Sequence, residues 1–411
     1  MKKNVLIMCQ YFYPEYVSSA TLPTDLAEDL IGKGLSVDIL CGYPKEYYEG
    51  KEVPKKEQYK GINISRVKYT EFNNKSKIGR IANFFSFFMS MLLRFPSLFK
   101  YECVLVYSNP PILPLIPYLI SRITKTKFIF VAFDIYPDNA LKLGAIKKDG
   151  FIEKLMKSIN KRVYGYASSV VALGNEMKHY MLEQGLVSEE EKIKVIPNWY
   201  SDNKITDNDI VFNEEFKDLR EKWPFIVLYS GNMGTAQDMD TILECISMLK
   251  NREDILFIFT GHGNKVSYVK EYLNSNEIKN AKIDGFLLGS DYIDILKISD
   301  VCLVSLAEGI EGIGVPSKTY GYLAAGKPVL AIMSDKTDIA KNLREYNAGG
   351  SVMQGEAEKL KVLIMKYMSN KEGLEEASIN ARKIFEDLYD RKICTDMYYH
   401  MIIEAINKGK L

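Results

Sequence analysis

The chain has 411 residues, a length that favours two domains over one. Apolar residues make up 47% and charged residues 26% of it, a globular mixture that excludes intrinsic disorder, and a net charge of +1 gives no field that would indicate nucleic-acid binding. The six cysteines are scattered through mostly apolar runs and the three histidines are far apart. We therefore expect reduced core thiols of a cytoplasmic protein, and neither a disulfide framework nor a zinc site.

The first predicted strand is Asn4–Cys9, whose apolar run is too short for a signal peptide. A helix over Leu22–Lys33 and a strand over Ser36–Cys41 complete a strand–helix–strand unit, expected to be parallel and right-handed. The loop after the first strand lacks GxGxxG, which argues against an NAD enzyme. In that loop Ser18 and Ser19 either cap the helix or offer small, close-approach positions to a ligand.

A strongly apolar segment, Lys75–Lys100, follows a Tyr-, Lys- and Glu-rich stretch, Tyr43–Lys60, that we predict to be an exposed excursion. The apolar segment is too short to span a bilayer, and it is apolar around most of its circumference, so one buried face does not account for it. It is either a helix buried between the sheet and its neighbours or, as we favour, a helix that docks on the anionic cytoplasmic membrane surface. Its membrane residues would be Arg80, Phe84, Phe85, Phe87, Phe88 and Arg94.

Two acids follow the strand predicted over Lys127–Phe133. Asp134 and Asp138 stand just past its carboxyl end, where open α/β sheets bind ligands. Each is a site candidate, and the alternative is that it caps the following turn. Further along, the composition becomes acidic and Asn-rich, which indicates an interdomain linker over residues 201–223. The predicted domains are therefore residues 1–200 and 224–387, followed by a helical segment over 388–411.

The second half is predicted to be another doubly wound α/β sheet, so the fold class is α/β with two Rossmann-like domains. Its strand-end loops, which should converge on one edge of the sheet, are Ser230–Gly234, Gly261–Gly263, Asp284–Phe286 and Glu308–Lys318. The first loop joins the strand Ile226–Tyr229 to a helix start. Unpaired backbone N–H groups at such a turn suit an anionic phosphate.

The loops SGNMG, TGHG, DGF and EGIEGIGVPSKTYGYLAAGKPV, in this order, resemble those of retaining glycosyltransferases of family 4. That family has the GT-B fold, with two Rossmann-like domains facing a central cleft. The segments YFYPE, FDIYPD and VIPN extend the resemblance over nearly the whole chain. Within the family the chain looks most like bacterial transferases that add N-acetyl-fucosamine and related sugars to lipid-linked precursors of O-antigen or capsule.

The resemblance implies a UDP-sugar donor, a lipid-diphosphate-linked acceptor, no metal or other cofactor, attachment to the inner face of the cell membrane, and a last helix that returns to the first domain. Distal-phosphate contacts would come from the amides of residues 231–234. The acidic DMD triplet at 238–240 is attributed to a helix start and not to a metal site. The donor contacts are expected from Ser230, Gly231, Asn232, Gly234, Gly261, His262, Gly263, Lys265, Phe286, Pro316, Ser317 and Tyr320.

This chain departs from the family at two places. It lacks the Arg–Lys pair that commonly follows the first glycine loop, so we assign the charge on the leaving UDP to Lys318, with Lys265 second; an exposed lysine at a helix start is the alternative for each. Gly321 occupies the place of a ribose-binding Glu. Glu311, or else Glu308, remains available to contact the donor sugar, and Asp134 stands where the family often has His.

The resemblance thus predicts retaining glycosyl transfer in which Lys318, Glu311 and Asp134 act at the donor. The donor phosphate itself takes the acceptor proton, so no protein nucleophile is required. Two other functions fit the same fold, namely a UDP-sugar 2-epimerase and a non-catalytic scaffold subunit. The epimerase is soluble and would not need the Phe-rich basic helix, whereas the scaffold would explain the missing Glu.

Overall fold

The computed structural model describes residues 3–44, 50, 52–72, 77–201 and 211–408. The chain divides into two compact units: unit 1 comprises Met1–Asn198, Ile313–Val315 and Arg391–Leu411, and unit 2 comprises Trp199–Gly312 and Pro316–Asp390. Residues 202–210 of the predicted linker lie outside the described residues. The end of that predicted linker is helix α7 (Glu214–Lys222), which the side chain of Asn213 caps and which packs on α10 (Gly289–Ile298) of unit 2.

Within the described ranges of unit 1, eight strands form one sheet in the order β3-β4-β2-β1-β5-β6-β7-β8. All neighbouring strands are parallel except β3, which pairs antiparallel with β4. The prediction that Tyr43–Lys60 is an exposed excursion is therefore wrong for the residues of β3. At the edge of the sheet, one face of β3 is exposed and the other is only partly buried, so its composition resembles that of a loop. The strands are β1 (Asn4–Met8), β2 (Ser36–Gly42), β3 (Lys56–Tyr59), β4 (Ile62–Val67), β5 (Cys103–Tyr107), β6 (Lys127–Val131), β7 (Ser169–Ala172) and β8 (Ile193–Val195).

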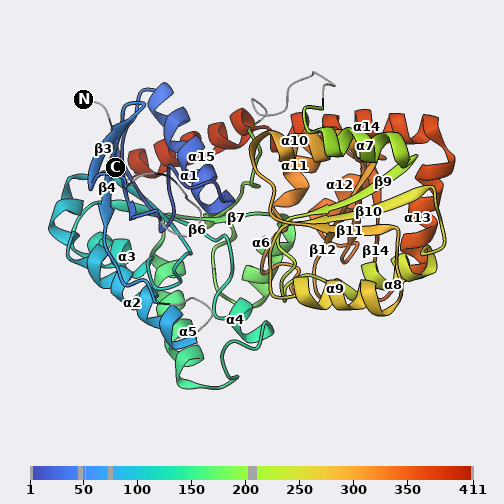
Figure 1. Cartoon of the computed structure of the whole chain (residues 1–411). Coiled ribbons are helices and arrows are strands. Elements are labelled where there is room, and N and C mark those ends of the chain that lie inside the picture. The colour runs from blue at the N-terminus through green and yellow to red at the C-terminus, as the bar shows by residue number, and fades with distance from the viewer. Residues whose placement is uncertain (1–2, 45–49, 51, 73–76, 202–210, 409–411) are drawn as a thin grey trace. The chain divides into compact units, whose positions relative to one another are not determined.

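Helices cover both faces of this sheet (Figure 1). One face carries α1 (Ser18–Gly32) and α15 (Arg391–Lys408), which Arg391 joins through hydrogen bonds to Asp25 and Asp29 of 2.7–3.0 Å. The other face buries its apolar side chains against a second layer of helices. That layer consists of α2 (Lys77–Leu92), η1 (Phe95–Lys100), α3 (Leu115–Ile123), α5 (Phe151–Tyr166) and α6 (Asn175–Glu183), while the short α4 (Asp138–Lys142) follows β6 and the single turn η2 (Glu190–Lys192) precedes β8.

Unit 2 contains a fully parallel sheet in the order β11-β10-β9-β12-β13-β14. The chain order reverses between β9 and β12, the place where open parallel sheets bind ligands. These two strands pair only at Val227–Val301 and Leu228–Cys302, so they separate toward their carboxyl ends. The strands are β9 (Phe225–Ser230), β10 (Ile255–Thr260), β11 (Ala281–Asp284), β12 (Val301–Ser305), β13 (Val329–Ile332) and β14 (Gly349–Val352).

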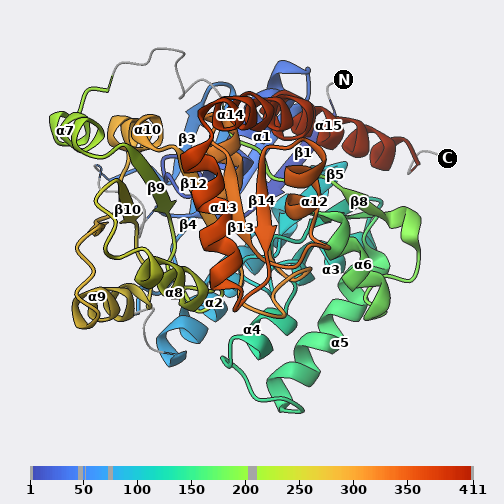
Figure 2. The same ribbon diagram turned by 90° about the vertical axis from the view of Figure 1, so that its right-hand side faces the viewer.

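The helices of unit 2 again form two layers. One face of the sheet carries α8 (Asp240–Met248), α9 (Val266–Ser275) and α13 (Ala357–Ser369); the other carries α10, α11 (Lys318–Ala324) and α12 (Asp338–Glu345), with α14 (Lys371–Ile384) and η4 (Phe385–Tyr389) beside them. Figure 2 shows α7 beside α10 and α8 beside α9. All six cysteines are buried and free, as predicted. Within the described ranges, none of the helices combines the length and apolarity that crossing a bilayer requires.

Candidate functional site

The glycine turn after β9 packs backbone-to-backbone on the loop after β10. Gly261 and Gly263 have φ angles of +130° and +138°, and a Cβ at either one would lie 2.1–2.2 Å from a carbonyl oxygen of the turn. Gly231, with φ of +132°, is similarly restricted to conformations that favour glycine. Gly261 and Gly263, predicted as donor contacts, are therefore required for the close approach of the two loops, whereas a Cβ at Gly231 would meet the side chain of Lys318 at 3.1 Å.

Most of the turn's backbone N–H groups already have protein acceptors, which limits the prediction that the amides of residues 231–234 hold a phosphate. Only the N–H of Asn232 lacks an acceptor among the described residues of the turn. The occupied pairs are Gly231 to Thr260 C=O (2.9 Å), Met233 to His262 C=O (2.7 Å) and Gly234 to Gln237 Oε1 (2.9 Å). A phosphate at this turn would therefore find one free backbone donor and need a side-chain cation.

The cation beside this turn is Lys318, on the first turn of α11. Its Nζ lies 3.3 Å from the carbonyl oxygen of Asn232 and 3.7 Å from the ring centroid of Tyr229. One helical turn later, the hydroxyl of Tyr322 donates to the C=O of Ser230 (2.9 Å) and accepts from its N–H (2.7 Å). Tyr322 thus forms the hydrogen bonds that a neighbouring strand would form with Ser230 at the point where β9 and β12 separate. Its i, i+4 spacing from Lys318 is the sequence signal that could have placed both side chains on the same face of the helix.

Lys318 and Lys265 differ in how their charge is used. No carboxylate of the described chain forms an ion pair with Lys318, and burial lowers the pKa of its ammonium to about 7. The ammonium of Lys265 donates a hydrogen bond to the C=O of Gln237 at 2.7 Å, so its charge is used to stabilise the segment that follows the turn. A poorly solvated cation without a counter-charge favours an anionic ligand, so Lys318 is the stronger of the two candidates.

The carboxylate of Glu311 is occupied by its own unit. It accepts hydrogen bonds from the backbone N–H of Gly309 (2.9 Å) and of Ser334 (3.3 Å) and from Nε2 of Gln354 (2.8 Å). Glu308, the alternative, is exposed. In this state Glu311 holds the loop after β12, and Gln354, which sequence reasoning missed, helps to orient it.

The remaining predicted donor residues lie at the same edge of unit 2 with unequal access. His262 and Phe286 are in edge contact, with ring centroids 5.1 Å apart, and both are exposed. Pro316 is buried and Ser317 directly precedes α11. Tyr320, predicted as a donor contact, is only 2% exposed and packs on Tyr389 with ring centroids 4.9 Å apart, so its ring belongs to the core.

Gly321, in the place of the expected Glu, faces two tyrosines. A Cβ at this position would lie 2.8 Å from the hydroxyl of Tyr292 and 3.4 Å from the ring of Tyr200. The room that a longer side chain would need is therefore filled by Tyr292. This contact could not be predicted from the sequence because Tyr292 comes from a different helix, α10.

Asp134, in unit 1, lies just after β6, and its backbone N–H donates to the hydroxyl of Ser108 at 3.2 Å. Burial raises the pKa of its carboxyl to about 6, while a hydrogen bond from Asn139 Nδ2 (2.9 Å) acts in the opposite direction. Gly314, which belongs to the same unit, forms a backbone bridge with Asp134. The carboxyl is thus protonated for part of the range near pH 6 and can then donate a hydrogen bond.

The predicted capping role of Ser18 and Ser19 is wrong. Helix α1 begins at Ser18 itself, four residues earlier than predicted, and its N-cap residue is Val17, which makes no side-chain cap. Of the acids at 238–240, Asp238 accepts hydrogen bonds from the N–H groups of Asp240 and Thr241 at 3.1–3.2 Å, as expected of an acid at a helix start.

Helix α2 has two apolar faces, which corrects the prediction that all its phenylalanines reach a membrane. Phe87 is fully buried in the core of unit 1, and Phe84 and Phe88 are partly buried. On the opposite face lie exposed side chains at a spacing of three or four residues, together with Arg80. The exposed apolar residues of this outer stripe are Ile78, Ile81, Phe85, Met89 and, just beyond the helix, Leu93.

Comparison with known proteins adds three observations. Residues 211–384 match the model of the family described as "Glycosyl transferases group 1". Over 258 residues the chain is 30% identical to the probable glycosyltransferase WbjE of Pseudomonas aeruginosa, covering 60% of this chain and 61% of the relative. Over 213 residues it is 22% identical to WcaI of Escherichia coli (strain K12), whose name assigns it to colanic acid biosynthesis as a glycosyl transferase, covering 51% of each chain.

The structure of Anabaena Alr3699/HepE in complex with UDP and glucose superimposes with a TM-score of 0.73 at 13% identity, over 98% of this chain and all of that one. The fold is GT-B. The predicted fold class of two doubly wound α/β domains is thus confirmed, and the residues that match the glycosyl transferases group 1 model belong mostly to unit 2. The sequence matches cover less than two thirds of either curated relative.

Proposed function

We propose that the protein is a metal-independent retaining glycosyltransferase of family 4 in cell-surface polysaccharide synthesis. It would move a sugar, with an N-acetylated deoxyhexosamine as one candidate, from a UDP-sugar to a lipid-diphosphate-linked glycan precursor. The observation that carries the proposal is the ammonium of Lys318, which has no carboxylate partner in the described chain and lies 3.3 Å from the turn at the switch point of a glycosyltransferase group 1 domain.

The chemistry expected of this arrangement is stabilisation of a leaving nucleoside diphosphate. Lys318 and the N–H of Asn232 would balance the charge that develops on the phosphate as the glycosidic bond breaks. The acceptor hydroxyl attacks the same face of the sugar and passes its proton to the departing phosphate. Glu311 orients the loop after β12 and would contact the sugar only if a donor displaces one of its three present hydrogen bonds.

The experiment is a screen of nucleotide sugars for UDP release, with and without a lipid-diphosphate acceptor. UDP release that requires the acceptor supports the transferase. Sugar isomerisation without UDP release indicates the epimerase, and the absence of both with every nucleotide sugar indicates the scaffold. Addition of a chelator should leave the rate unchanged if no metal takes part.

We also propose that the outer stripe of α2 attaches the protein to the inner face of the cell membrane. Four of its side chains are more than half exposed, among them Ile81 at 57% and Phe85 at 59%, and Arg80 stands beside them. Apolar side chains with neighbouring cations suit an anionic lipid interface. This occupant accounts for the stripe better than another protein would, since an exposed cation next to the stripe matches the charge of the lipid head groups.

Vesicle co-sedimentation tests this attachment. Replacing Ile81 and Phe85 by Ser should weaken binding to vesicles containing phosphatidylglycerol by about tenfold or more, since each side chain contributes on the order of 1 kcal/mol when it leaves water. The matched control replaces Val362 and Ile379 of unit 2, which are 63% and 71% exposed. Equal vesicle binding by both double variants would refute the proposal that α2 attaches the protein to the membrane.

A further inference from the structure

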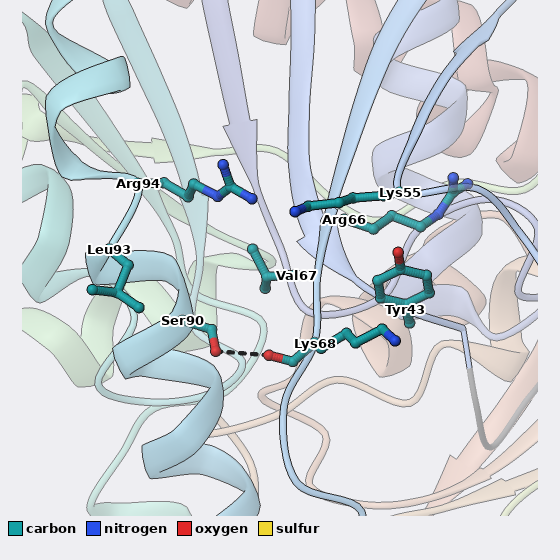
Figure 3. A pocket seen from close by; sticks show the side chains of 8 residues that line it. All are labelled: Tyr43, Lys55, Arg66, Val67, Lys68, Ser90, Leu93 and Arg94. Atoms are coloured by element: carbon teal, nitrogen blue, oxygen red, sulfur yellow. Dashed lines mark hydrogen bonds between the residues drawn. The ribbon is translucent and has the colours of Figure 1, made fainter.

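A pocket of about 390 Å³ lies within unit 1, and none of the residues assigned above to the donor lines it (Figure 3). It opens at the carboxyl edge of the sheet, because Tyr43 directly follows β2 and Lys68 directly follows β4. The end of α2 closes it, and the hydroxyl of Ser90 donates to the C=O of Lys68 at 2.7 Å. The lining residues are Tyr43, Lys55, Arg66, Val67, Lys68, Ser90, Leu93 and Arg94.

Four of these residues carry positive charge, but only Arg66 has its charge balanced. The Arg66 guanidinium is buried, pairs with Glu57 at 2.7 Å and donates to two backbone carbonyls. Lys55, Lys68 and Arg94 have no ion pair with any described residue. The pocket thus combines three unbalanced positive charges with the hydroxyl groups of a serine and a tyrosine.

The direction of these side chains indicates a shared ligand. Figure 3 shows Lys55 and Arg94 extending toward one another from opposite sides of the pocket, although their like charges repel. A polyanion between them would remove that repulsion and accept hydrogen bonds from both. The number of charges matters, since three cations match a diphosphate better than the single charge of a phosphodiester.

The rim of the pocket is apolar where it meets α2. Leu93 lines the pocket, is 80% exposed, and continues the outer stripe at the spacing of one helical turn after Met89. A ligand that lies along both features would have a strongly anionic head and an apolar remainder. A free nucleotide or inorganic anion matches the basic pocket alone.

We infer that this basic pocket binds the diphosphate head group of a membrane lipid whose chain lies along the outer stripe of α2. The inference rests on the proposed function, because it places the lipid-diphosphate part of the acceptor in unit 1. No bond is made or broken at the pocket. Its residues hold the anchored end of the molecule.

Direct binding of farnesyl diphosphate, a short water-soluble isoprenyl diphosphate, tests the inference on the full chain. Replacing Lys55 and Arg94 by Gln should weaken binding by about ten- to a hundredfold, the loss expected for two charge-assisted hydrogen bonds. The charge-matched control replaces Lys270 and Lys279 of unit 2 by Gln; both are exposed and unpaired within the described chain. Equal affinity of the two double variants overturns the inference.

Two further probes separate the sources of the anion. Inorganic pyrophosphate that binds as tightly as farnesyl diphosphate would refute the lipid part of the inference. A third outcome is that farnesyl diphosphate does not bind, while the Lys55→Gln/Arg94→Gln change weakens binding to phosphatidylglycerol vesicles. This outcome would refute the diphosphate lipid as ligand and indicate a bulk phospholipid instead. Thermal unfolding of each variant checks that it is folded.

Failure of this inference is distinguishable from failure of the proposed function. The pocket variant should keep its affinity for UDP, which unit 2 binds. If the pocket variant loses affinity for farnesyl diphosphate but the protein shows no acceptor-dependent UDP release, the transferase function is refuted and the inference about the pocket stands. If acceptor-dependent UDP release is the same in the pocket variant as in the unchanged protein, the transferase function stands and the inference about the pocket is refuted.

Discussion

Replacing Lys318 by Met tests the candidate site in two independent quantities, since Met has a similar length and no charge. The folded chain holds this ammonium at a pKa of about 7 instead of its ordinary 10.5 because it is buried. The unfolded chain therefore binds more protons between about pH 7 and 10.5, so Lys318 lowers stability most below pH 7 and not at all above 10.5. At about pH 7.5 the difference of 3 pH units corresponds to at most about 4 kcal/mol, and partial exposure reduces it to roughly 1–2 kcal/mol.

Lys318→Met should thus raise the free energy of unfolding by about 1–2 kcal/mol at pH 7.5, and the gain should vanish by about pH 10.5. The same change should lower kcat by about 10²–10³, or about 2.7–4 kcal/mol, the cost of one oxyanion-type donor. Urea unfolding and acceptor-dependent UDP release measure the two effects, with Lys270→Met as the exposed control. A near-unchanged kcat removes Lys318 from the reaction, and a loss of stability assigns it to packing instead.

UDP affinity should fall by up to about tenfold per pH unit above pH 7, because the diphosphate binds the charged form of Lys318, and calorimetry on Lys318→Met should show no such slope. Gly261→Ala should destabilise unit 2 by about 2–4 kcal/mol in urea unfolding, since its Cβ would meet a carbonyl oxygen at 2.1 Å; a cost below 1 kcal/mol contradicts this packing. Asp134, whose carboxyl has its pKa raised to about 6 by burial, binds more protons in the folded chain between pH 3.8 and 6, so it costs stability as pH rises through that window; Asp134→Asn should remove the slope in unfolding experiments at pH 4 and pH 6.5. Gly321→Ala should cost about 1–2 kcal/mol through the Tyr292 hydroxyl, and an unchanged Tm would show that this tyrosine moves freely.

Buried parallel strands were the easiest elements to predict. Runs such as Ile226–Tyr229 are apolar on both faces of the sheet and end at a glycine turn, so their type and order follow from the sequence. The edge strand β3 was missed because its solvated side chains carry no such pattern. Phe87 was misassigned for a related reason: α2 is apolar on two faces, and the sequence does not say which one the sheet covers.

The residues of the strand-end loops in unit 2 could be predicted from the sequence, but the hydrogen-bond partner of each polar group could not. The sequence shows glycines after β9 and β10, but it does not distinguish a glycine that allows a ligand to approach from one that allows another backbone segment to approach. In the structure, Gly261 and Gly263 allow the close approach of another backbone segment. Because the two loops are hydrogen-bonded to each other, the turn is rigid before any ligand arrives, and it has little N–H capacity left for a phosphate. In the proposed function the positive charge therefore comes from a side chain held against that turn, and Lys318 has this position.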